Sequence, residues 1–252
     1  MTIPASAPAK PDLSELLDII EHSRHVFRKR LEVLAQGTGM TREIYIRYLS
    51  FQHHQTKGVQ RHFVTVAGHP DLADKPELRN FLFQFALEEE PHYKVAEVDL
   101  KRMGEKPLPC PLDVSLWLAY FDQVVQKRPF VRLGATCILE NLGAGAGALG
   151  RELLDADFLS PECTRFLDIH FHEELPHGDQ IIEALESGPL SDRNLLDLKE
   201  GAHVGSIMYL RFVDWATKSS ELTVKEFDGN SSVDRPAEAP TYLDLEELTT
   251  PS

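Results

Sequence analysis

The stretch Phe166–Gln180 reads FLDIHFHEELPHGDQ and carries three histidines and two glutamates between His170 and His177. Side chains of these types at such density form either a solvated helix face or a metal site. A helix turns by about 100° per residue, so Glu174 and His177 share one stripe with His170. His172 falls on the opposite face. The stretch therefore predicts that His170, Glu174 and His177 converge on a metal ion.

A second stretch of the chain repeats this motif. Segment 88–92 reads EEEPH and aligns without a gap with segment 173–177, EELPH, from which it differs only at the third position. Both contain a Glu-x-x-His pair, whose spacing lets a carboxylate and an imidazole bind one ion from adjacent helical turns. Both also place proline directly before the histidine. A proline inside a helix costs about 3 kcal/mol, so its repetition beside ligand-type residues indicates a functional constraint on the backbone.

A third candidate ligand lies between the two motifs. Segment 130–154, FVRLGATCILENLGAGAGALGRELL, has the apolar periodicity of a helix, and Glu140 lies in its middle. A carboxylate in such apolar surroundings is costly to bury unless it is paired or bound to a metal. Glycines at positions 143, 147 and 150 allow another helix to approach closely. Glu140 is therefore either a metal ligand or a buried, hydrogen-bonded acid.

Together the three segments predict a metal centre with six ligands. Mixed oxygen and nitrogen ligands without thiolates favour iron or manganese over structural zinc or calcium. Six ligands suit two ions with a bridging carboxylate, which leaves positions open for dioxygen. Each motif alone is also consistent with a charged surface segment, but three segments with matching residues favour the metal site. The predicted ligands are Glu89, His92, Glu140, His170, Glu174 and His177.

The whole chain predicts one all-α domain of seven helices. Apolar residues recur at three- and four-residue spacings almost throughout, without a convincing strand pattern. Thr41 and Ser160 lie where helix N-caps are expected. Residues 1–11 are predicted to be disordered, residues 12–219 to form the domain, and residues 220–252 to be an acidic tail. The predicted helices span residues 12–36, 41–68, 76–103, 112–127, 129–155, 160–186 and 191–219.

Composition excludes several classes of function. With 252 residues, 42% of them hydrophobic, the chain is long enough to bury a full core. Its net charge of −14 argues against nucleic acid or an anionic membrane surface as the main partner. No apolar stretch approaches the length of a bilayer span, and the N-terminus has no apolar signal core. Because the three cysteines form no CxxC pair, we expect a soluble, cytoplasmic protein.

Two helical scaffolds hold ligand sets of this kind. In ferritin-like four-helix bundles, two helices each supply a glutamate and two others each supply a Glu-x-x-His pair. The chain fills five of these six roles, but segment 41–63 offers only Glu43, at its very start, as the earlier glutamate. His170 supplies the sixth ligand instead, which favours a different scaffold. A ferritin-like dimetal carboxylate protein and a non-catalytic helical interaction protein remain the alternatives.

The pattern resembles the heme-oxygenase-like superfamily, and within it the non-heme di-iron oxidases and oxygenases. The resemblance covers about residues 20–215 and implies the same six metal ligands that the motifs predict. The chain departs from that family at Glu174, where aspartate is common, and at Pro91, where glycine is frequent; neither change removes a ligand. The stretches that carry the resemblance are LEVLAQGTGMTREIYIRYLSFQHH, LEEEPHYKVAEVDLKRMG, CILENLGAGAGALGREL and HFHEELPH.

The resemblance implies an oxidoreductase that uses dioxygen and two Fe(II) per chain to oxidise a small metabolite in a biosynthetic pathway, such as one for a natural product. The expected substrate is an amino acid or amino-acid derivative, and the expected reaction is C–C cleavage, desaturation or N-oxygenation. An external electron donor and a homodimer are expected as well. Further side chains predicted to support the ligands or to hold the substrate are Glu88, Glu173, His53, His54 and Arg132.

Overall fold

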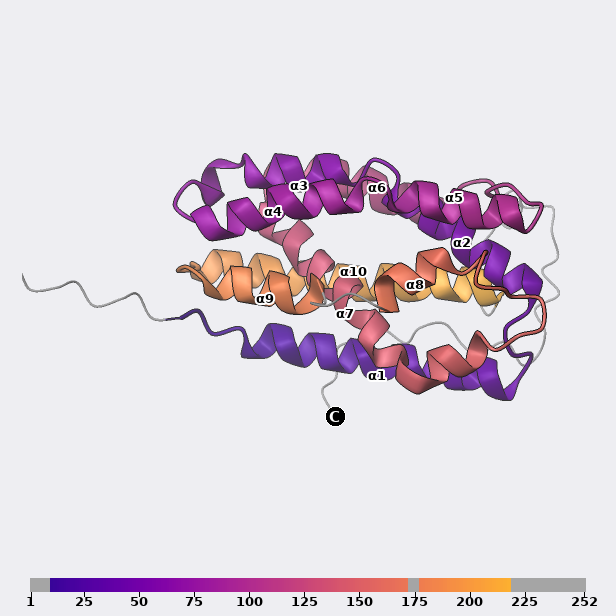
Figure 1. The fold of residues 1–252 in the computed structure, drawn as a ribbon. Coiled ribbons are helices and arrows are strands. Elements are labelled where there is room, and N and C mark those ends of the chain that lie inside the picture. The colour runs from indigo at the N-terminus through magenta and orange to yellow at the C-terminus, as the bar shows by residue number, and fades with distance from the viewer. Residues whose placement is uncertain (1–9, 172–176, 219–252) are drawn as a thin grey trace, which may run out of the picture.

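The computed structural model describes residues 10–171 and 177–218, and this part of the chain is all-α, without a β-strand (Figure 1). The predicted fold class is therefore confirmed. The helices are α1 (Ser14–Gln36), α2 (Arg42–Thr56), α3 (Gln60–Ala67), the 3-10 turn η1 (Pro70–Leu72), α4 (Pro76–Glu89), α5 (His92–Arg102), α6 (Leu112–Val124), α7 (Pro129–Leu153), α8 (Arg165–Phe171), α9 (His177–Glu186) and α10 (Asp192–Thr217).

Four of the seven predicted helices, α1, α6, α7 and α10, lie close to their expected bounds. Thr41 caps α2 as predicted, because its hydroxyl accepts a hydrogen bond from the backbone N–H of Ile44. The predicted helix 41–68 is divided into α2 and α3 by a turn at Gly58. The φ angle of Gly58 is +81°, a left-handed conformation that favours glycine and ends a helix.

Pro91 separates α4 from α5. The sequence predicted a proline inside one continuous helix, and this prediction is wrong for Pro91, since α4 ends at Glu89 and α5 begins at His92. Proline has no N–H to donate, and its ring clashes with the carbonyl four residues back. Pro91 instead lies just before the first turn of α5, where its carbonyl accepts a hydrogen bond from the N–H of Lys94 at 2.9 Å. The break brings Glu89 and His92 to adjoining ends of two helices.

The predicted helix 160–186 contains α8 and α9, and α8 begins later than expected. Ser160 is not its N-cap, because the helix starts at Arg165. The first turn of α8 is held from another helix: a carboxylate oxygen of the buried Asp99, on α5, accepts a hydrogen bond from the backbone N–H of Phe166 at 2.8 Å. An acid at a helix N-terminus is stabilised there by the exposed N–H groups.

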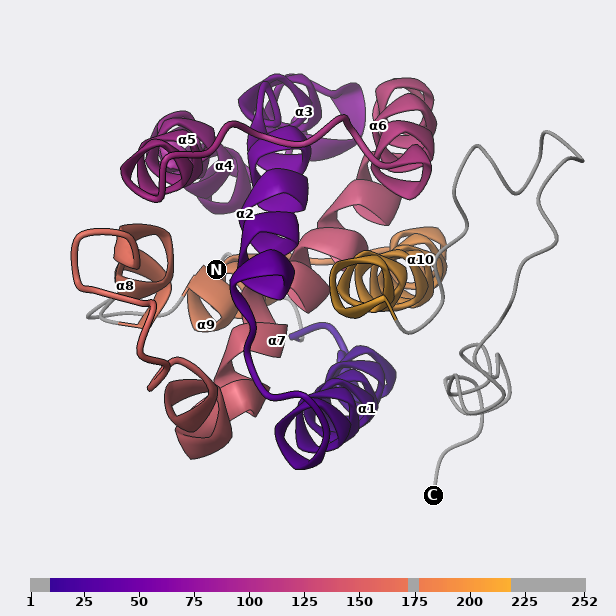
Figure 2. The same cartoon turned by 90° about the vertical axis from the view of Figure 1, so that its right-hand side faces the viewer.

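Helix α7 runs obliquely through the middle of the molecule, between the level of α6 and that of α1 (Figures 1 and 2). It contacts α1, α3, α6, α9 and α10. Leu133 and Ile138 belong to the largest apolar cluster, while Val131 and Ala135 belong to a second cluster shared with α2, α6 and α10. Both clusters therefore pack around α7.

Helices α7 and α10 meet backbone to backbone at glycines. A Cβ atom added to Gly134 would lie 1.9 Å from the carbonyl oxygen of Leu198. A Cβ atom added to Gly201 would lie 1.9 Å from the carbonyl oxygen of Val131. Gly205 lies one turn further along α10, and a Cβ atom added there would lie 2.9 Å from the Cα atom of Ala135 on α7. Any side chain at these positions would force the two helices apart.

None of the helices in the described ranges has the length and apolar character required to cross a membrane. The predicted tail, residues 220–252, and residues 1–9 of the predicted N-terminal segment lie outside the described residues. The division of the chain into these segments therefore stays a prediction.

We expect Gly134→Ala to lower the free energy of unfolding by about 1–3 kcal/mol or more, because overpacking at a helix–helix contact forces backbone shifts. Urea denaturation of the purified protein measures this change.

Gly143→Ala, on the same helix, is the matched control. A Cβ atom at Gly143 would meet no atom within 4 Å, so alanine is expected to stabilise α7 there by about 0.5–1 kcal/mol. Equal losses of stability in the two variants would contradict the close packing of α7 on α10.

Candidate metal centre

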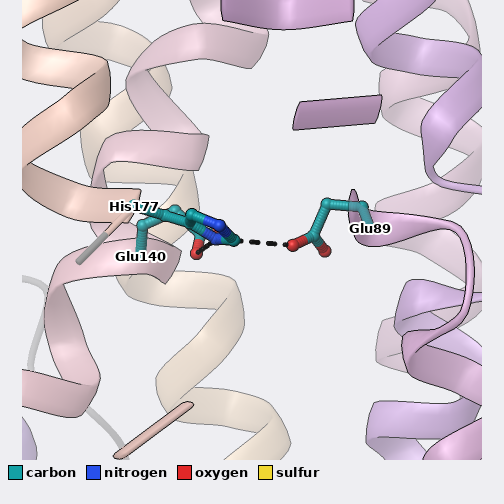
Figure 3. A group of neighbouring side chains, drawn as sticks. All are labelled: Glu89, Glu140 and His177. Carbon is teal, nitrogen blue, oxygen red and sulfur yellow. Dashed lines mark ion pairs between the residues drawn. The ribbon is translucent and has the colours of Figure 1, made fainter. Parts of the chain in front are cut away.

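Three helices that are distant in sequence bring candidate ligands together. Glu89 is the last residue of α4, Glu140 lies in the middle of α7, and His177 is the first residue of α9. One side-chain atom of each lies within 4.8 Å of the corresponding atoms of the other two. Figure 3 shows Glu140 and His177 side by side, with Glu89 facing them from the opposite helix. The structure thus assembles two carboxylates and an imidazole, a set that could bind a metal ion.

The group is largely withdrawn from solvent, with 6% of Glu89 and 8% of His177 exposed. The Nδ1 atom of His177 lies 3.7 Å from Oε1 of Glu89 and 3.6 Å from Oε2 of Glu140. These separations exceed an ordinary hydrogen bond, as expected of ligand atoms that face a common point. Carboxylates held so close together in a low-dielectric setting are destabilised unless a cation compensates them.

Glu89 lies between two imidazoles. While its Oε1 atom faces His177, its Oε2 atom lies 3.1 Å from Nδ1 of His92. Burial lowers the pKa of His92, but the hydrogen bond and charge of Glu89, together with the charge of Glu140, outweigh burial and raise that pKa above its ordinary value. The two oxygens of this one carboxylate are thus directed at the imidazoles of two different histidines.

The second ring nitrogen of His177 has a carboxylate partner. Its Nε2 atom lies 3.1 Å from Oε2 of Glu88, the residue before the candidate ligand Glu89. The ring of Phe85 packs edge to face against the imidazole at 4.9 Å. A histidine that binds a metal through one nitrogen commonly donates its other N–H to a carboxylate, which fixes the orientation of the ring. Glu88, predicted as a supporting residue, lies where it could provide this contact.

Three predicted residues lie in or beside a segment that the structure does not describe. His170 is in α8, but its side chain is outside the described part. Glu173 and Glu174 fall within residues 172–176, which lie outside the described ranges. The roles of these three residues therefore stay predictions.

His53 and His54 do not line the site. Helical phase turns them toward α5 and the segment that follows it, where Nδ1 of His53 lies 3.2 Å from the carbonyl oxygen of Tyr93 and Nε2 of His54 lies 2.7 Å from that of Leu108. Gln52 and other residues of α2 face inward instead. The sequence showed that adjacent residues cannot face one point, but it could not tell which face of α2 is the inner one.

The structure adds residues that sequence reasoning missed. Asn141 follows the candidate ligand Glu140, and its side-chain oxygen accepts a hydrogen bond from Arg24 of α1 at 2.6 Å. Gly178 follows His177 and packs on that same asparagine, since a Cβ atom there would lie 2.7 Å from the amide group. Arg24 and Asn141 therefore help to set how α7 and α9 meet. Only the small residue after His177 hinted at this contact in the sequence.

A cavity of about 200 Å³ adjoins the candidate ligands. Glu89 and Glu140 lie in its wall, and so does Arg132, which was predicted as a substrate residue. Most of the other described lining residues are apolar, and they come mainly from α1, α2, α7 and α10, with further residues from α3 and α8. The candidate metal group therefore adjoins a mainly apolar space that is partly open to solvent.

No protein-family model and no curated protein matches this chain. Among solved structures, the chain is similar to the crystal structure of a domain of unknown function with a heme oxygenase-like fold from Shewanella denitrificans OS217. The TM-score is 0.70 at 20% sequence identity, and the match covers 90% of this chain and 99% of that one. The chain therefore has a heme oxygenase-like fold, as the resemblance implied. At this identity the comparison concerns the fold alone.

The consecutive residues Glu88, Glu89 and Glu90 allow a graded test of the metal site. Calorimetry measures the affinity of each variant for Co(II). We expect Glu89→Gln to weaken Co(II) binding by more than about 100-fold, since a direct ligand is lost. We expect Glu88→Gln to weaken it by about 10- to 100-fold, the usual effect of losing the partner of a metal-bound histidine.

Glu90→Gln is the matched control, because Glu90 lies at the surface and pairs with Lys94. It should leave the affinity unchanged. If all three variants bind Co(II) equally, the three residues Glu89, Glu140 and His177 are not a metal site.

Proposed function

We propose that this protein is a dioxygen-activating, non-heme di-iron oxidase or oxygenase that acts on a small metabolite. The observation that carries the proposal is Glu89, whose two oxygens face His92 and His177 beside a second acid, Glu140. A merely structural helix bundle does not need two acids and two histidines so close together, with Glu89, His92 and His177 buried and Glu140 partly buried. A dimetal centre does call for them.

The donor set fits iron. Carboxylate and imidazole ligands suit first-row ions such as Fe(II) and Mn(II), whereas calcium prefers oxygen ligands alone and structural zinc prefers thiolates. Glu89, His92, Glu140 and His177 would hold two ions, completed by the predicted ligands His170 and Glu174. When bound, iron supplies the electrons that activate dioxygen and the oxidising power for the substrate.

The surrounding residues have distinct roles in this proposal. Glu88 orients His177 through its Nε2 atom, and Arg24 acts through Asn141 to hold α7 beside α9. The apolar wall of the cavity excludes water from the reacting groups, which strengthens electrostatic interactions within it. An external electron donor is part of the proposal whenever the substrate itself does not supply all the electrons that dioxygen requires.

The predicted substrate, an amino acid or amino-acid derivative, belongs to the same proposal, as does a place in a biosynthetic pathway. Arg132 in the cavity wall supports a substrate that carries a carboxylate. C–C cleavage, desaturation and N-oxygenation are the reaction types to be screened. The homodimer and the cytoplasmic location stay predictions.

Two other functions remain to be separated from this one. A ferritin-like protein would have a different arrangement of helices, and the similarity to a heme oxygenase-like fold argues against it. A non-catalytic interaction protein would bind no metal and would not react with oxygen. Replacing its glutamates would therefore change neither property.

Anaerobic titration with Fe(II) tests the proposal. We expect about two Fe(II) per chain, and exposure to oxygen with candidate substrates should produce a transient visible absorbance and a changed substrate. Glu140→Gln should lose both, because it removes one charge of the site while conserving the size of the side chain.

Glu90→Gln again provides the control and should behave like the wild type. Absence of iron binding in the wild-type protein would overturn the proposal. If iron binds, but exposure to oxygen changes neither the absorbance nor any of the amino acids and simple carboxylic acids tested, the protein binds metal without the proposed oxidase activity.

A further inference from the structure

The packing of α10 on α7 places Tyr209 beside the candidate ligand Glu140. Gly205, one turn before Tyr209, packs on α7 so closely that an added Cβ atom would lie 2.9 Å from the Cα atom of Ala135. Gly201 packs in the same way one turn earlier on both helices, so α7 and α10 run in the same direction here. The next turn of each helix brings Tyr209 level with the residues around Glu140. Both side chains line the cavity.

The ring and the oxygen of Tyr209 are both held in place. The ring packs edge to face against Phe27, Phe51 and Phe212, with ring centres 6.1, 5.9 and 6.3 Å away. Nε2 of the buried Gln52, on α2, donates a hydrogen bond to the hydroxyl oxygen at 3.2 Å. The position of the phenol oxygen is therefore set by three other helices and its own.

The proton of this phenol is left to donate. Because Gln52 is the donor in their hydrogen bond, the O–H group of Tyr209 retains its own donor capacity. No residue in the described ranges accepts a hydrogen bond from it. Burial raises the pKa of Tyr209 to about 12; the hydrogen bond from Gln52 acts to lower that pKa and the charge of Glu140 to raise it. The hydroxyl therefore keeps its proton at neutral pH.

Other hydroxyl groups of the cavity wall are committed or more distant from the charge of the candidate ligands. Those of Tyr45, Thr56 and Thr217 each donate to a backbone carbonyl oxygen, at 2.9, 2.7 and 3.0 Å. Burial and the neighbouring tyrosines raise the pKa of Tyr48, whereas for Tyr209 a glutamate of the candidate metal group contributes. Tyr209 is therefore the hydroxyl best placed to serve that group.

A ligand bound at the metal centre would need such a donor. Glu89 and Glu140 are carboxylates, which accept hydrogen bonds and cannot donate them when ionised. An anion, or dioxygen that receives electrons from a metal, carries negative charge on the atoms that face away from the metal. Donors that are already fixed in place stabilise this charge effectively. A phenol is also neutral, so it does not compete with metal ions for the two glutamates.

We propose that Tyr209 is a further catalytic residue, whose hydroxyl donates a hydrogen bond to the small ligand, dioxygen or an anion, bound at the metal centre beside Glu140. Gln52 is its positioning residue, because it holds the phenol oxygen from α2. The phenol keeps its proton throughout, so no covalent bond is made or broken at Tyr209. This inference rests on the proposed function, since the ligand binds through a metal ion.

Azide titration of the full chain loaded with Co(II) tests this role, with the visible absorbance of Co(II) as the readout. Azide is a small anion that binds metals and accepts hydrogen bonds. Tyr209→Phe keeps the ring and removes the hydroxyl, so we expect azide affinity to fall about 10- to 100-fold, the range for a hydrogen bond to a charged group. Its affinity for Co(II) should be that of the wild type. Tyr120→Phe, on α6 and outside the cavity wall, should leave both affinities unchanged.

Imidazole is the matched control ligand. When it binds a metal through one ring nitrogen, the other is an N–H donor and cannot accept a hydrogen bond. Its affinity should therefore be equal in the wild type and in Tyr209→Phe. A general disturbance of the metal centre would instead weaken imidazole and azide to the same extent.

A double-mutant cycle tests the positioning role of Gln52. Gln52→Leu alone should weaken azide binding by about 3- to 10-fold, the range for a hydrogen bond between neutral groups. Added to Tyr209→Phe, it should cause no further loss, because no hydroxyl is left to orient. Independent, additive losses would show that Gln52 does not act through Tyr209.

The outcomes separate this inference from the proposed function. If Co(II) binds but azide affinity is the same in Tyr209→Phe, or azide does not bind at all, this inference is wrong and the metal centre stands. Equal weakening of azide and imidazole would also overturn it. A wild-type protein that binds no Co(II) would overturn both. If azide binding depends on the hydroxyl but oxygen changes no substrate, the hydrogen bond stands and the oxidase activity does not.

Discussion

The close contact between α7 and α10 is the constraint on which the rest of the structure depends. Gly134 and Gly201 let two backbones touch, so α7 can pass through the middle of the molecule rather than along its surface. That course gives α7 contacts with five other helices, buries Arg132 and leaves Glu140 partly buried. A central helix that carries an acid and a cation is unusual in a bundle held together by apolar packing, and its acid belongs to the candidate metal group.

The charges around α7 are arranged in two parts. Glu89 and Glu140 lie close to His177, while Arg132 lies among aromatic rings at the wall of the same cavity. Among the described residues no ion pair joins the two parts, although the negative charges of Glu140 and Glu89 act to raise the pKa of Arg132. Buried charges that are not paired directly cost free energy.

The helix break at Pro91 determines how Glu89 faces its two histidines. In a continuous helix, a glutamate and a histidine three residues apart lie on adjacent turns of one cylinder. Here Glu89 ends one helix and His92 begins the next, so the carboxylate can face His92 with one oxygen and a histidine of α9 with the other. The proline thus supports the site by ending a helix, instead of storing strain within one.

The sequence by itself determined the fold class, most of the helices and the residue types of the site. Apolar periodicity and repeated Glu-x-x-His motifs are local properties, and local properties can be read from spacing. It did not determine the inner face of α2, the helix break at Pro91, the support of Asn141 by Arg24 or the aromatic surroundings of Arg132. These features depend on which distant helices meet, and only the tertiary structure decides that. The local sequence pattern leaves alternative helix faces and backbone breaks nearly equal in free energy, and long-range packing selects among them.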